Sequence, residues 1–106
     1  MKKIYVWIKH PGEKARHVWM SNREGNIHNF LNGPIAELKI ATDLVLLYAE
    51  GMEFSDKHFN KNIMGKQFFG SIIFAGPKGE DGLYTDCPMD KDAFKTLFPE
   101  LLKEEK

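Results

Sequence analysis

The sequence has little of several features that define common protein classes. It contains a single cysteine, Cys87, so an intrachain disulfide is excluded and a reducing compartment is expected. Neither sign of charge is in excess, since 15 Lys and Arg stand against 15 Asp and Glu. That balance argues against a general nucleic-acid binder and against an acidic DNA mimic. The apolar run at residues 4–8 is too short for a signal peptide or a membrane span. We therefore expect a soluble, cytoplasmic protein without a membrane partner.

The length of the chain, 106 residues, is that of one domain. A chain of this size buries roughly two thirds of its unfolded surface, which is enough for a core without disulfides or a structural metal. The sequence contains no internal repeat and no low-complexity linker. We expect a single domain over residues 1–102 and a frayed tail over residues 103–106.

Hydrophobic patterning predicts a mainly antiparallel sheet. Runs rich in β-branched and aromatic residues predict about five strands, with the run at 44–49 as a central strand because it is almost continuously apolar. Short connections favour hairpins, and Gly70 predicts a bulge within the last strand. The expected strands are residues 3–8, 15–20, 35–40, 44–49 and 67–75.

Two helices are expected beside this sheet. Ser21 and Glu24 have the spacing of a capping box, and Gly33 is suited to a left-handed helix end. A short helical turn is expected near residues 57–63. Asp90 is placed to cap a last helix, which Pro99 should kink or follow with a second short turn. The sequence thus predicts a small α+β domain with two helices packed on the sheet.

Charge alternates in blocks along the chain. Residues 1–23 and 57–78 carry net charges of +5 and +4, whereas residues 24–56 and 79–106 carry −5 and −4. If the two basic blocks fold side by side, they form one positive face that attracts phosphate or an acidic protein. In the alternative interpretation, the blocks neutralise each other across the fold.

No arrangement of residues in the sequence is typical of catalysis or metal binding. The four histidines lack the spacing of a metal site. Cys87 is flanked by Asp86 and Asp90, which work against a reactive thiolate. The glycine-rich stretch at 76–82 lacks the order of a phosphate-binding loop. We therefore predict no catalytic residue, no metal and no cofactor.

Aromatic residues alternate with the basic blocks and suggest a binding surface. Such rings beside Lys or Arg can stack on bases and hold phosphates, although they can equally belong to the core. The rings concerned are Tyr5, Trp7, Trp19, Phe59, Phe68 and Phe69. The residues predicted to contact a ligand or partner are Lys9, Arg16, Trp19, Arg23, Lys66 and Lys78.

Several short segments resemble one small domain family of unassigned function, found mainly in phages and mobile elements of bacteria. They include Lys9-His10-Pro11-Gly12, Gly33-Pro34-Ile35-Ala36-Glu37, the strand at 43–51, and the strand and loop Gly70-Ser71-Ile72-Ile73-Phe74-Ala75-Gly76-Pro77. The resemblance covers about residues 2–98. It departs from the family pattern at Gly70-Ser71, where Gly-Asp is usual, and at Glu50-Gly51-Met52, where an Asn-Glu-Glu-Gly run is usual. It carries over no catalytic residue. It implies a phage accessory protein in a bacterial host cell, a setting in which small proteins often antagonise host defence by binding.

The leading hypothesis is a non-catalytic counter-defence protein that inhibits a host immune component. That component is either a nuclease effector, such as a CRISPR nuclease, or a nucleotide-type signal. The alternatives are a small nucleotide-processing enzyme with His17 as its base, and a regulatory protein of phage replication. An unpaired strand edge and the surplus of aromatics also allow a homodimer.

Overall fold

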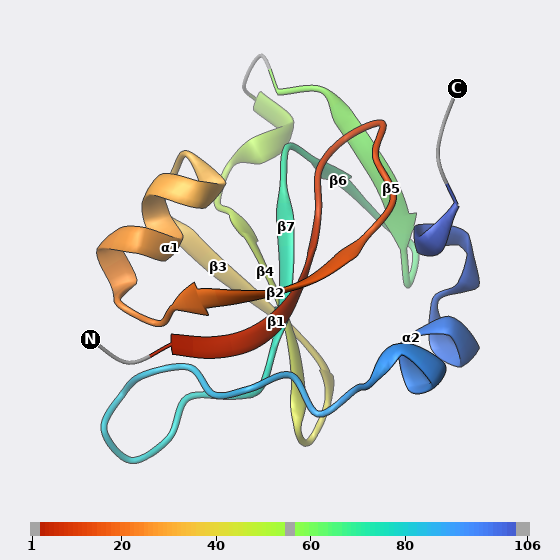
Figure 1. The fold of residues 1–106 in the computed structure, drawn as a ribbon. Helices are drawn as coiled ribbons and strands as arrows, with labels where there is room; N and C mark the ends of the chain where they lie inside the picture. Colours follow the sequence, from red (N-terminus) through yellow and green to blue (C-terminus); the bar gives the residue numbers. More distant parts are fainter. Residues whose placement is uncertain (1–2, 55–56, 104–106) are drawn as a thin grey trace.

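An antiparallel sheet forms the centre of the protein in the computed structural model, which describes residues 3–54 and 57–103 (Figure 1). Within this described part the sheet has five strands in the order β2-β1-β7-β4-β3, and β5 and β6 form a separate two-stranded sheet. The strands are β1 (Lys3–Lys9), β2 (Arg16–Ser21), β3 (Ile35–Ala41), β4 (Leu44–Ala49), β5 (Phe59–Ile63), β6 (Lys66–Phe69) and β7 (Ile72–Ala75). The helical elements are α1 (Glu24–Leu31), η1 (Met52–Phe54), α2 (Lys91–Leu97) and η2 (Pro99–Leu102). The predicted α+β class is confirmed.

Two hairpins build most of the larger sheet, as the short connections predict. β1 and β2 pair antiparallel, with Tyr5 opposite Trp19 and Trp7 opposite His17. β3 and β4 form the second hairpin, and β7 pairs with both β1 and β4. The apolar run of β4 lies inside the sheet, and most of its residues are buried. Its prediction as a central strand is confirmed.

The segment before β7 differs from its prediction. The helical turn expected near residues 57–63 is wrong, because this stretch forms β5 and pairs with β6. Met64 and Gly65 connect the two strands with φ of 53° and 80°, the left-handed pair that a tight hairpin turn requires. The single strand expected at 67–75 is also wrong. Gly70, with φ of 80°, ends β6 and lets the chain cross into the other sheet as β7.

The helix ends agree with the sequence in part. The capping box at Ser21 is wrong, since Ser21 ends β2 and Arg23 occupies the N-cap of α1. The left-handed residue after α1 is Asn32, with φ of 58°, and not Gly33. The cap at Asp90 is confirmed, because its Oδ1 accepts a hydrogen bond from the Ala93 N–H at 2.8 Å. η2 begins at Pro99, as expected.

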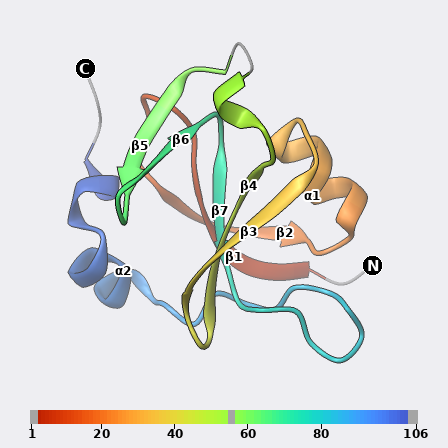
Figure 2. The same cartoon turned by 180° about the vertical axis from the view of Figure 1, so that it is seen from behind.

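Helices lie on two sides of the five-stranded sheet. Figures 1 and 2 show α1 and α2 on opposite sides of these strands, with the β5–β6 hairpin at the end away from the N-terminus. The largest fully buried apolar side chains include Phe68, Phe74 and Phe94. The sheet ends at two edge strands, β2 and β3, and a few large hydrophobic side chains, including Trp19 and Met64, are exposed. The predicted tail begins at residue 103, and its residues 104–106 lie outside the described part.

Candidate functional site

A stack of five rings leads from the surface into the core, and we call it the aromatic stack. It runs Trp19, Tyr5, His17, Trp7 and Phe94, with ring centroids 4.7, 3.6, 4.5 and 4.2 Å apart in that order. Successive rings are within 10° of parallel. Trp19 is 61% exposed, whereas Trp7 is 3% exposed. An exposed indole is thus held by a rigid column of rings beneath it.

Strand alternation and register produce this stack. Residues two apart on a strand share a face, so Tyr5 and Trp7 lie on the same side as their partners Trp19 and His17. The inner end is fixed by α2, whose Phe94 packs on Trp7. The Trp7 indole N–H also donates to the Met89 carbonyl oxygen at 3.0 Å. Parallel rings at these separations stabilise one another beyond the area that they bury.

His17 lies in the middle of the stack, enclosed between Tyr5 and Trp7. Its Nε2 is buried and has no hydrogen-bond partner among the described residues. Burial lowers the pKa of His17, and the nearby Asp90 carboxylate opposes that shift. Because rings cover both faces of the imidazole, this placement does not support the alternative in which His17 is a catalytic base.

Lys9, one of the predicted contact residues, is inside the protein and is 0% exposed. Its Nζ donates to Asn60 Oδ1 at 2.8 Å and to the His10 carbonyl oxygen at 3.0 Å. Asn60 in turn donates to the Lys9 carbonyl oxygen at 2.9 Å. The prediction of Lys9 as a surface contact is therefore corrected. It joins β1 to β5.

Three of the predicted residues share one edge of the sheet. Arg16 and Trp19 are exposed on β2, and Arg23 is exposed just beyond its end. We call these three residues, with the strand that carries them, the β2 edge. Residues 14–23 contain no acidic side chain. In the described part of the chain, residues 16–21 make no backbone hydrogen bond to any element besides β1.

The remaining two predicted cations lie elsewhere. The Lys66 ammonium is 5.4 Å from the ring centroid of Tyr48 on β4. The Lys78 ammonium is 5.1 Å from the Tyr84 ring, whose hydroxyl donates to Glu37 Oε2 at 2.6 Å. The six residues thus do not form one positive face. Arg16, Trp19 and Arg23 form the β2 edge, and Lys9 is buried. Lys66 and Lys78 each lie over a tyrosine ring elsewhere in the fold.

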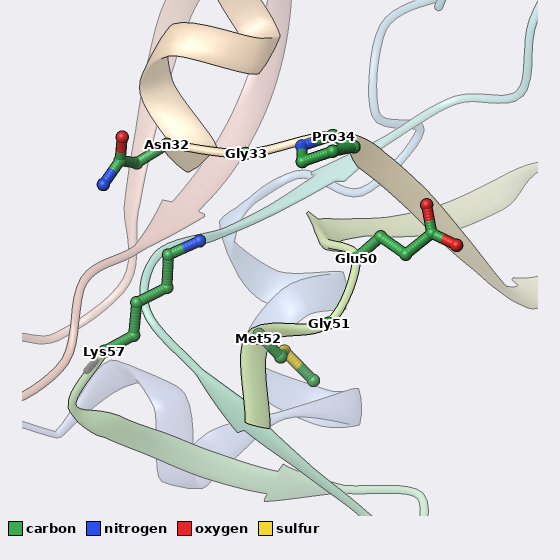
Figure 3. A pocket seen from close by; sticks show the side chains of 7 residues that line it. All are labelled: Asn32, Gly33, Pro34, Glu50, Gly51, Met52 and Lys57. Carbon is green, nitrogen blue, oxygen red and sulfur yellow. The ribbon is translucent and has the colours of Figure 1, made fainter. Parts of the chain in front are cut away.

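A pocket of about 460 Å³ lies where α1 ends, and sequence reasoning missed it (Figure 3). Its lining includes Asn32, Gly33, Glu50 and Lys57. Figure 3 shows the Lys57 side chain pointing toward the chain at Gly33, whereas the Glu50 carboxylate points away. The Lys57 ammonium donates to the Leu31 carbonyl oxygen at 3.0 Å, and burial lowers the pKa of Lys57. This cation therefore holds the helix end.

A neighbouring pocket of about 230 Å³ shares Asn32 and Lys57 with the first. Ser71 on its wall has its Oγ 2.6 Å from His10 Nδ1. This hydrogen bond joins the turn after β1 to the connection between β6 and β7. Both pockets are thus bordered by side chains that hold elements together, and neither contains a residue that the sequence predicts to bind a ligand.

Among the described residues, no group of three or more His, Cys, Asp or Glu is placed to hold a metal ion. Burial raises the pKa of Cys87 to about 11, so its thiol stays protonated at neutral pH. No helix in the described ranges is long and apolar enough to cross a membrane.

No protein-family model, no curated protein and no solved structure matches this chain. Function is therefore inferred from the geometry of the surface, in which the β2 edge is the most specific feature.

Proposed function

We propose that this protein is a non-catalytic binding protein that inhibits a host immune protein, such as a nuclease effector, by docking through the β2 edge. One observation carries the proposal: Trp19 is 61% exposed and is still fixed in place by the aromatic stack. The counter-defence setting comes from the resemblance to phage and mobile-element proteins described above.

The chemistry of the β2 edge supports a protein partner. Tryptophan and arginine are the residues that most often dominate binding energy at protein interfaces, and Trp19 lies between Arg16 and Arg23 along the chain. Binding is weakened when flexible side chains must be ordered. Stacking on Tyr5 orders the Trp19 ring in advance. The β2 edge therefore presents a large apolar ring that is already ordered in the free protein, so that little side-chain entropy is lost when a partner binds.

The test is inhibition of purified host nuclease effectors, including CRISPR nucleases, by the wild-type protein and by Trp19→Ala. We expect wild type to block DNA cleavage stoichiometrically and to remain chemically unchanged. Loss of a central tryptophan costs 2 kcal/mol or more at such interfaces, so Kd should rise about 30-fold or more.

Met64→Ala is the matched control, because Met64 is 65% exposed and lies in the β5–β6 turn, which belongs to the other sheet. It should bind like wild type. Equal inhibition by wild type and Trp19→Ala would remove the β2 edge from the mechanism. Multiple turnovers of any substrate would contradict a non-catalytic function.

A nucleotide-type signal is the second candidate ligand, because a base could extend the aromatic stack beyond Trp19. Native mass spectrometry of the protein from its expression host separates this case from the first. A stoichiometric small molecule on wild type that is absent from Trp19→Ala would identify the ligand class. A mass of the polypeptide alone, with tight binding to a nuclease, would favour the protein partner. A phage protein as the sole partner would instead indicate a role in replication.

A further inference from the structure

We propose that the β2 edge binds an extended, acidic segment of its partner as an additional strand of the sheet. The inference rests on the proposed function and specifies its binding mode. Three observations carry it: the position of β2 at the sheet edge, the absence of acidic residues from 14–23, and the hydrogen bonds that anchor the chain just beyond both ends of β2.

The backbone of β2 is available for pairing. Alternate residues of an edge strand direct their N–H and C=O groups away from the sheet, where another chain can pair with them. Within the described ranges, the backbone of residues 16–21 forms hydrogen bonds only to β1. The strand is also fixed beyond both ends. The Ala15 N–H donates to the Leu101 carbonyl oxygen at 2.6 Å, and the Asn22 side chain donates to the Tyr84 carbonyl oxygen at 3.1 Å.

The charge of the edge selects an acidic segment and disfavours a second copy of this chain. If two copies paired β2 with β2, two segments that each carry Arg16 and Arg23 and no acidic residue would lie side by side, and like charges on neighbouring strands are destabilising. A partner strand with Asp or Glu near Arg16 and Arg23 meets no such repulsion. Charged residues on an edge strand are a common protection against self-association.

The alternation of side chains specifies the partner further. Arg16 and Trp19 are three residues apart on β2, so their side chains lie on opposite faces of the sheet. A complementary strand therefore needs an apolar residue beside Trp19 and an acidic residue three positions away beside Arg16. The other edge strand of the same sheet, β3, differs in charge, because it carries the acidic Glu37 as well as the basic Lys39. It provides an internal control.

The experiment is selection of a random library of linear 12-residue peptides on the wild-type protein, followed by hydrogen exchange with the enriched peptides. We expect an apolar residue and an Asp or Glu three positions apart. Peptide binding should slow exchange of β2 amides and leave β3 amides unchanged. The double variant Arg16→Glu/Arg23→Glu should raise the peptide Kd at least tenfold, whereas Lys39→Glu on β3 should not.

Failure to enrich any peptide, enrichment without acidic residues, or protection away from β2 would each overturn the inference. The two proposals fail separately. If Trp19-dependent inhibition of a nuclease is observed without strand addition by peptides, the proposed function stands and this binding mode is wrong. If the acidic peptides add to β2 but no host nuclease is inhibited, the binding mode stands and the nuclease target is wrong.

Discussion

Lys9 and Asn60, which are 51 residues apart in the sequence, form two reciprocal hydrogen bonds. The Lys9 ammonium donates to Asn60 Oδ1 at 2.8 Å, and Asn60 Nδ2 donates back to the Lys9 carbonyl oxygen at 2.9 Å. The same amide donates to the Gly70 carbonyl oxygen at 2.8 Å. One buried side chain thus satisfies polar groups of β1 and of the end of β6. These hydrogen bonds connect the two-stranded β5–β6 sheet to the five-stranded sheet.

Replacing Asn60 with alanine should therefore destabilise the protein strongly. The Lys9 ammonium loses an oxygen partner in a buried position, and two backbone carbonyls lose a donor. We expect the free energy of unfolding to fall by about 3 kcal/mol. Urea denaturation measures this change. Asn62→Ala, at an exposed position of the same strand, should change stability by less than about 0.5 kcal/mol. Equal effects of the two variants would contradict the role of Asn60.

Replacement by alanine should have opposite effects on stability at two glycines, Gly76 and Gly25. A Cβ at Gly76 would overlap the Thr85 side chain and the Asp86 backbone, so Gly76→Ala should cost about 1–3 kcal/mol. Gly25 lies in α1 and a Cβ there meets nothing within 4 Å, so Gly25→Ala should stabilise the protein by about 0.5–1 kcal/mol. Thermal unfolding of both variants checks the pair. A stable Gly76→Ala protein would show that the loop can move away from β7.

Stability should decrease as the pH falls below about 6.5, because burial lowers the pKa of His17 from its ordinary value of 6.5. Just below that pH the unfolded state takes up a proton that the folded state does not bind, so acid favours unfolding. His17→Phe keeps a ring in the stack and should flatten the pH dependence of stability below about 6.5. Denaturation at several pH values measures this slope. His58→Phe, at an exposed position, should retain the wild-type slope.

Cys87 should be unreactive in the folded protein. Burial raises its pKa to about 11, so little thiolate is present at neutral pH, and the side chain is 7% exposed. A thiol reagent should modify the native protein slowly and the urea-unfolded protein at the rate of a free cysteine. Rapid modification under native conditions would show that the segment 84–89 opens readily.

The sequence predicts those elements whose signals are local. The strands at residues 3–8 and 44–49, the short hairpin connections, and the helix cap at Asp90 are all confirmed because neighbouring residues determine them. The segment 57–69 has little periodicity, and its pairing depends on the Met64-Gly65 turn and on Gly70, where a left-handed conformation redirects the chain. Local patterns did not reveal that change of sheet.

The candidate site was predictable only in part, for the same reason. Alternation shows that Tyr5 and Trp7 share a face, but the cover over Trp7 comes from Met89 and Phe94, more than 80 residues away. Charge alone groups Lys9 with Arg16, and only the packing of β5 shows that one is buried and the other exposed. Trp19, Arg16 and Arg23 could be predicted together because they lie close in sequence, on β2 and just beyond its end.

The aromatic stack also provides an intrinsic circular dichroism signal that reports on the position of Trp19. Rings held nearly parallel at these separations couple their electronic transitions, so the folded protein should give a strong near-ultraviolet circular dichroism band. Any partner that tilts Trp19 changes that coupling without an added label. Docking at the sheet edge can thus be followed in solution, and the same band shows whether the core below remains intact.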